Sequence, residues 1–171
     1  FREANNKCYM ELSDIIEDYM KKVSDVVGRK YVPYQYYGAE NATDIIIAMG
    51  SVSGTIEETV DALNKRGRKT GFLQIHMYRP FDIKKFIAAI PASVKRIAVL
   101  DRCKEMGAAG EPLYVDVCTA LFKSDRDIRV IGGRYGLSSK DTSPEQIVAV
   151  FDNLASNRPI NSFTIGIEDD V

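Results

Sequence analysis

Hydrophobic and polar positions follow two different patterns along the chain. Between positions 4 and 27, apolar residues recur every three or four positions, which predicts an amphipathic helix that ends at Gly28. Four later segments are short and almost wholly apolar, as expected for strands that are covered on both faces of a parallel sheet. These segments are 44–50, 70–76, 95–101 and 127–133.

Helices are predicted between these strands and after the last of them. Thr55 and Glu58 have the spacing of a capping box at the start of the first helix. Asp82 can cap the second, and Pro112 begins the third. A serine followed by a proline begins the last helix, at 144–154. Strands that alternate with helices indicate right-handed crossover connections and a parallel sheet between two layers of helices.

Two further segments have the composition of strands. The aromatic stretch 31–38 is β-prone, but Pro33 restricts it to an edge strand or an extended connector. The segment 162–167, "SFTIGI", can form a further strand near the end of the chain.

Composition limits the class of protein. The chain has 171 residues, of which 45% are hydrophobic and 27% charged, so we expect one globular domain. A net charge of -1 gives no basic field for nucleic acid, and no apolar run is long enough to span a membrane. Three distant cysteines argue against a disulfide framework and for a cytoplasmic location. Because the chain starts at Phe1 and stops soon after an apolar run, we expect a piece of a longer polypeptide.

Three loops follow the carboxyl ends of predicted strands, where α/β sheets receive ligands and partners at the point of reversal of the strand order. The first, "GSVSGT", contains Gly50 and Ser51 and is either an anion cradle at a helix start or a tight turn. It lacks the lysine of a P-loop. The loop after the fourth strand contains Arg134 and Tyr135, residue types that are common both at interfaces and on solvated loops.

The loop after the third strand, "DRCKEMGAAGE", combines charged residues, a thiol and glycines. Arg102 and Lys104 could lower the pKa of Cys103 and make it a nucleophile. A cysteine nucleophile also needs a base, and the single histidine, His76, follows another strand, so we expect Cys103 to have no role. The residues of this loop that we expect to dock against a neighbour or to contact an anion are Arg102, Lys104, Glu105 and Gly110.

No metal site and no catalytic residue are predicted. The cysteines lack the close spacing of zinc or iron-sulfur motifs, and one histidine cannot complete a cluster. Glu168, Asp169 and Asp170 could form an acidic metal cluster, but a solvated exit from the last strand explains them more simply.

Taken together, several segments resemble the second domain of the pyruvate:ferredoxin (flavodoxin) oxidoreductase family, which is similar to the C-terminal domain of transketolases. The family more often has threonine and proline where this chain has Cys103 and Met106, which weakens any essential role for Cys103. The segments that carry the resemblance are "AMGSVSGTIEETVD", "QIHMYRPFD", "VLDRCKEMGAAGEPLYVDV", "GGRYGLSSKDTSPEQI", "FTIGIEDDV" and the opening "REANNKCYMELSDIIEDYMKKVSDVVGRKY".

The resemblance implies a three-layer α/β/α fold with a five-stranded, mostly parallel sheet. Its antiparallel edge strand corresponds to "YQYYG". The strand at 44–50 is then expected between the strands at 70–76 and 95–101, so that "GSVSGT" and "DRCKEMGAAG" flank the switch point. The chain is expected to divide into a lead-in helix, 1–30, and a transketolase C-terminal-like α/β domain, 31–171.

The resemblance also implies a parent enzyme that oxidatively decarboxylates pyruvate. That enzyme uses thiamine diphosphate, magnesium, iron-sulfur clusters and coenzyme A as a substrate, and it reduces ferredoxin or flavodoxin. The thiamine and cluster motifs are absent from this chain. We therefore expect a non-catalytic, cofactor-free structural or docking domain that contacts other domains of its polypeptide and a second subunit. The alternative is an anion- or coenzyme A-binding module at the switch point.

Overall fold

The four apolar segments form the centre of one sheet. A computed structural model of the chain describes residues 2–167. The central strands run parallel in the order β3-β2-β4-β5. Every residue of β2 is buried, as a strand covered on both faces requires. The strands are β2 (Asp44–Ala48), β3 (Thr70–Ile75), β4 (Arg96–Asp101) and β5 (Arg129–Arg134).

Two shorter strands lie at the edges of the sheet. β1 (Tyr34–Gly38) pairs antiparallel with β3, which confirms the expected edge strand. β6 (Phe163–Thr164) pairs parallel with β5, so the sheet has six strands and not the expected five. The sixth strand forms because the backbone N–H groups of Ser162 and Ile165 donate to carbonyl groups of β5.

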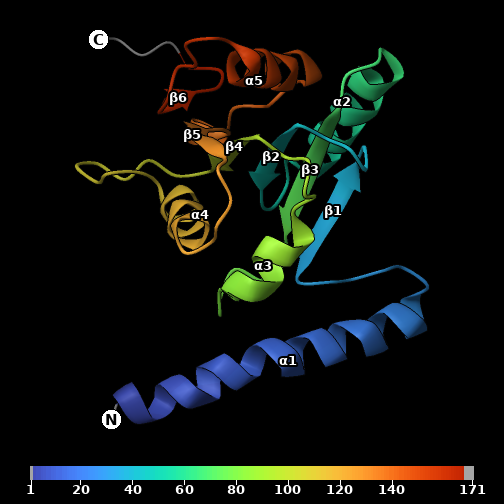
Figure 1. Cartoon of the computed structure of the whole chain (residues 1–171), viewed down its shortest axis with the longest axis vertical. Helices are drawn as coiled ribbons and strands as arrows, with labels where there is room; N and C mark the ends of the chain where they lie inside the picture. Colours follow the sequence, from blue (N-terminus) through green and yellow to red (C-terminus); the bar gives the residue numbers. More distant parts are fainter. Residues whose placement is uncertain (1, 168–171) are drawn as a thin grey trace.

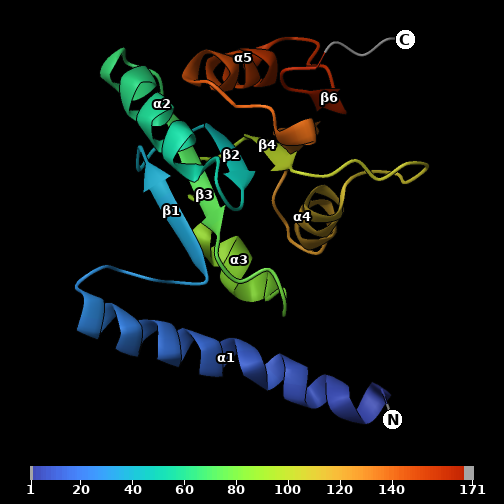
Figure 2. The same ribbon diagram turned by 180° about the vertical axis from the view of Figure 1, so that it is seen from behind.

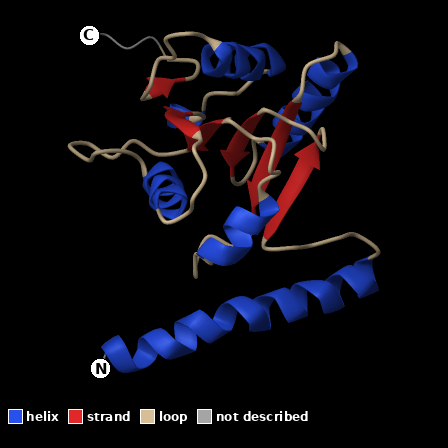
Figure 3. Ribbon diagram, in the orientation of Figure 1, coloured by secondary structure: helices blue, strands red, loops and turns tan. Residues whose placement is uncertain are grey.

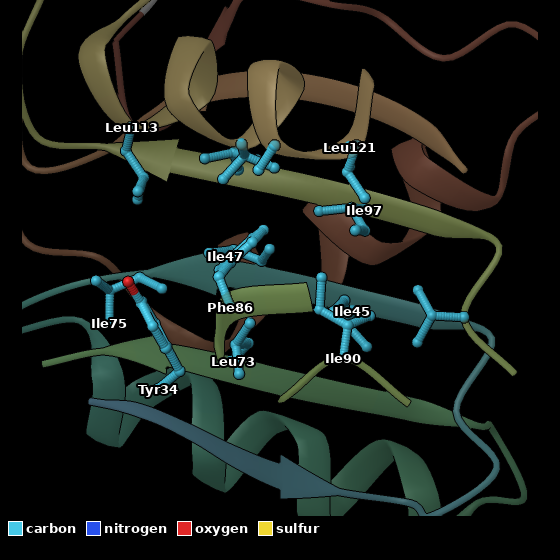
Figure 4. Packing of buried hydrophobic residues seen from close by; sticks show 14 of the residues in the cluster. Tyr34, Ile45, Ile47, Leu73, Ile75, Phe86, Ile90, Ile97, Leu113 and Leu121 are labelled. Carbon is cyan, nitrogen blue, oxygen red and sulfur yellow. The ribbon is translucent and has the colours of Figure 1, made fainter. Parts of the chain in front are cut away.

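Helices cover both faces of the sheet, which confirms the three-layer architecture (Figures 1 and 3). α2 (Ser53–Lys65) and α5 (Pro144–Ala155) lie on one face, and α3 (Ile83–Ala89) and α4 (Pro112–Phe122) lie on the other. Side chains of β2 alternate between the two layers of core, because successive residues of a strand point to opposite faces. Figure 4 shows the core on the side of α3 and α4, with Ile45, Ile47, Phe86 and Leu113 among its members.

Two of the three predicted helix caps are confirmed. Asp82 accepts a hydrogen bond from the backbone of Lys85, and Ser143 forms a capping box with Gln146. The predicted capping box at Thr55 is wrong, because α2 begins two residues earlier. Gly50, at φ +84°, turns the chain directly out of the sheet and into the helix.

The first helix, α1 (Arg2–Val27), lies apart from the sheet (Figures 1 and 2). It is fixed to the start of α3, where Ser13 Oγ donates to Asp82 Oδ2 at 2.7 Å. Lys85 Nζ also lies within 2.7 Å of carboxylates of α1. The predicted helix at 4–27 is thus confirmed, whereas the division of the chain at residue 30 stays a prediction.

Candidate functional site

The strand order reverses at β2, which lies between β3 and β4 as predicted. The loops after β2 and β4 flank this switch point and contact each other. Arg102 Nη1 donates to Ser51 Oγ at 3.2 Å. A cavity of about 330 Å³ opens beside this contact, between the start of α2 and the segment 135–142. The expected placement of the loops that contain Ser51 and Arg102 on either side of the switch point is thus confirmed.

The chemistry of this cavity favours an anion. Arg102 and Lys140 both line it, and the N-terminus of α2, which carries partial positive charge, lies at its edge. Asp141 is the one carboxylate among the lining residues. The phenol of Tyr135 donates to the carbonyl of Met49 at 2.7 Å, which fixes that ring against the end of β2.

A left-handed turn shapes the far wall of the cavity. Gly136 has φ +61°, and a β-carbon there would lie 3.0 Å from Nε of Arg102. Ser138 and Ser139, in the short helix η1 (Leu137–Ser139), also have positive φ angles. Glycine at 136 therefore lets the Arg102 side chain pass close to this turn on its way to the cavity.

The remaining residues of the loop after β4 do not reach the cavity. This loop projects away from the body between β4 and α4, as the yellow segment in Figures 1 and 2 shows. Lys104 Nζ lies 4.0 Å from Oε1 of Glu111, and Glu105 is exposed. Met106 is 92% exposed, and Gly110 packs against the ring of Tyr114. The tip of the loop is thus exposed to solvent, and its base is held by contacts within the domain.

Arg134 is not a surface residue, contrary to expectation. It is the last residue of β5, its exposed fraction is 3%, and its Nη1 lies 3.1 Å from Oε1 of buried Glu111. It also donates to Thr164 Oγ1 and to two oxygen atoms of Ser162. Tyr135 is equally buried. Both side chains therefore make their contacts within this domain.

Two buried carboxylates at the base of the loop have roles that the sequence did not predict. Asp101 accepts hydrogen bonds from the backbone N–H groups of Leu113 and Tyr114, at 2.9 and 3.1 Å, and so caps α4. Glu111 occupies the N-cap position without a capping bond and pairs with Arg134. Burial raises the pKa of Asp101 above its ordinary value.

Cys103 lacks the properties of a nucleophile. Partial burial raises the pKa of its thiol, and the negative charges of Asp101, Glu105 and Glu111 raise it further. The suggested lowering of this pKa by Arg102 and Lys104 is therefore wrong. His76 Nδ1 lies 2.8 Å from the carbonyl oxygen of Val32, a structural contact at the end of β3.

Metal-ligand clusters are not found in the described part of the chain, residues 2–167. The acidic cluster of Glu168, Asp169 and Asp170 lies outside the described residues. Among the described helices, none has the length and hydropathy needed to cross a membrane.

Comparison with known proteins gives a consistent set of relatives. Residues 42–147 match the family model described as pyruvate:ferredoxin oxidoreductase core domain II. The chain is 55% identical over 170 residues to a pyruvate-flavodoxin oxidoreductase of Enterobacter agglomerans. It is 49% identical over 170 residues to a pyruvate:ferredoxin oxidoreductase of Moorella thermoacetica. Both alignments cover 99% of this chain but only 14% of the relative.

A solved structure is also similar. It is a 2-oxoglutarate:ferredoxin oxidoreductase from Magnetococcus marinus, described with 2-oxoglutarate, coenzyme A and succinyl-CoA bound. The superposition has a TM-score of 0.48 and 19% sequence identity, and it covers 75% of this chain and 20% of that one.

Proposed function

Because the chain belongs to the pyruvate:ferredoxin oxidoreductase core domain II family, we propose that it is a docking domain of a pyruvate-oxidising enzyme. It contributes no catalytic residue of its own. The parent enzyme, in this proposal, oxidatively decarboxylates pyruvate in the cytoplasm and transfers electrons to ferredoxin or flavodoxin. The partners of this domain are the other domains of the same polypeptide and a second subunit.

The cofactors of the parent belong to other domains in this proposal. Thiamine diphosphate, magnesium and iron-sulfur clusters need dedicated ligands, and residues 2–167 contain no cluster of His, Cys, Asp or Glu side chains that could hold a metal. Cys8, Cys103 and Cys118 are separate free thiols. In this proposal, the ligands for these groups therefore come from other domains of the polypeptide.

The projecting loop after β4 is the observation that carries the docking function. Its two ends are fixed by the Asp101 cap and by the pair of Glu111 and Arg134, whereas Met106 near its tip is 92% exposed. A loop whose two ends are held in place loses less conformational entropy on binding than a loop with free ends. The loop is thus suited to fit against a neighbouring domain.

Two assays test this proposal. The isolated chain, supplied with pyruvate, thiamine diphosphate, magnesium and coenzyme A, is expected to reduce no electron acceptor, and turnover would refute the non-catalytic role. The chain is also grafted in place of the matching segment of the Enterobacter agglomerans enzyme, where pyruvate-dependent flavodoxin reduction is expected. In that graft, Met106→Lys should reduce activity at least several-fold, whereas Ala62→Lys, on the exposed face of α2, should not.

A second candidate function is an anion- or coenzyme A-binding module at the switch point. The cavity that contains Arg102 and Lys140 beside the start of α2 favours it. Titration calorimetry of the chain with coenzyme A, and separately with inorganic phosphate, decides the matter. Heat that is abolished by Arg102→Met supports the module, and no heat at millimolar coenzyme A counts against it.

A further inference from the structure

α1 carries apolar side chains on two of its faces. On one face, Ile16 and Met20 pack against the core beside α3. A second line of apolar residues, which we call the outer stripe, follows the spacing 3, 4, 4, 3 along the helix. The outer stripe consists of Leu12, Ile15, Tyr19, Val23 and Val26.

The outer stripe is exposed within the chain. Tyr19 is 62% and Val26 is 86% exposed, and Ile15 and Val23 are each close to half exposed. At about 100° per residue, the centre of the stripe lies roughly 80° around the helix from Ile16 and Met20. The charged residues Asp14, Asp18, Lys21 and Asp25 occupy the third face. A surface helix in contact with water on all its free sides would be polar on both of these faces, so the outer stripe indicates an interface.

A groove extends the outer stripe toward the body of the domain. It has a volume of about 350 Å³ and is lined by apolar and aromatic side chains, among them Ile15, Tyr19, Val23 and Tyr31. The steps of three and four residues within the stripe are those of a helix face that packs against another element. The complementary shape is therefore an amphipathic helix that lies along α1 with its own apolar side chains in the groove.

We propose that the outer stripe of α1 binds an amphipathic helix from another part of the longer polypeptide in which this domain functions. This inference rests on the proposed function. The length of the relatives supports the proposal. They align with 99% of this chain, but the chain covers only 14% of each of them, so most of such a polypeptide is available to cover α1. A second copy of this chain is the competing occupant, because the spacing of the stripe is symmetric about Tyr19.

Hydroxyl-radical footprinting tests the proposal in the graft described above. The modification rate of Tyr19 is measured in the isolated chain at low micromolar concentration and in the full-length graft. We expect the rate to fall at least five-fold in the graft. An unchanged rate overturns the proposal, whether or not the graft oxidises pyruvate. Activity of the graft with an unprotected Tyr19 therefore rejects this inference and leaves the proposed function intact.

A second measurement decides the case in which the graft does not fold. The tagged chain is added to the Enterobacter agglomerans polypeptide that lacks the matching segment, and binding is measured. The double variant Ile15→Lys, Tyr19→Lys is expected to bind at least ten-fold more weakly, whereas Ala62→Lys binds as the parent chain does. No binding by the parent chain, or equal binding by all three, overturns the proposal. Concentration-dependent dimers of the chain alone that the double variant abolishes would assign the stripe to a second copy instead.

Discussion

Replacement of Arg134 by methionine should be among the most destabilising single changes in this domain. The Arg134 and Glu111 side chains are almost fully buried, and Nη1 and Oε1 lie 3.1 Å apart. Methionine keeps most of the apolar length of arginine but removes its charge and every hydrogen bond that it donates. Three of those bonds join β5 to Ser162 and Thr164, so the substitution also loosens the edge of the sheet at β6.

The expected cost follows from the burial of the pair. Removal of one partner leaves a buried charge without compensation, which costs about 3–5 kcal/mol. At about 2–4 °C per kcal/mol for a domain of this size, Tm should fall by roughly 6–20 °C. Lys104 provides a matched control, because its Nζ lies 4.0 Å from the same carboxylate but its side chain is half exposed. Lys104→Met should therefore cost only about 0–1 kcal/mol.

The assay is urea unfolding followed by circular dichroism, with a double-mutant cycle. Glu111→Gln removes the charge that Arg134→Met leaves unpaired. The double variant should therefore be more stable than the sum of the single effects by about 0.5–3 kcal/mol. An Arg134→Met variant that loses no more stability than Lys104→Met would contradict this expectation, as would single effects at the buried pair that simply add.

Three further predictions concern other parts of the domain. A β-carbon on Gly38, at φ +122°, would lie 2.7 Å from Cα of Gly71. In a urea titration, Gly38→Ala should therefore lower the free energy of unfolding by roughly 1–3 kcal/mol from backbone strain alone, whereas Gly67→Ala, which has open space around it, should lower it less. Burial raises the pKa of Asp101, so the folded state binds a proton more tightly than the unfolded state does. As the pH falls from 7 toward about 4, the Tm of the unmodified chain should therefore rise relative to that of Asp101→Asn, and a constant difference between the two would contradict this. Because its pKa is raised, Cys103 should react with iodoacetamide at pH 7 several-fold more slowly than cysteine in an unfolded peptide, and an equal rate would contradict the burial argument.

The sheet could be predicted because each of its central strands is a short run of apolar residues that is visible in the sequence. Ile45 and Ile46 point to opposite faces of the sheet, and both are buried, so the strand had to be apolar throughout. The order of the strands came from the family resemblance, and it correctly placed Ser51 beside Arg102. The predicted start of α2 is wrong because the pattern at Thr55 is only a local spacing. The chain already turns at Gly50, so the helix begins at Ser53, before Thr55 is reached.

The buried charges could not be predicted from local patterns. Most arginine and glutamate side chains are exposed. Residue type therefore favours a surface position for Arg134 and gives no reason to single out Glu111. They are 23 positions apart in the sequence, and only the packing of β5 against the start of α4 joins them. Asp101 belongs to a strand and caps a helix twelve residues later, a spacing that no short capping motif describes. Long-range packing, and not residue type, determines these three positions.

The placement of these charges bears on what the projecting loop is for. A buried ion pair adds little stability compared with apolar residues of similar size, because desolvation of the two charges offsets most of their attraction. The pair instead fixes the position of the loop, because Glu111 and Arg134 hold one end of it while Asp101 holds the other. The exposed tip of the loop gains from such an anchor only if the orientation of the loop matters to something outside the domain. The buried charges at its base and the exposed Met106 near its tip are therefore both consistent with the contact to a neighbouring domain that we propose for this loop.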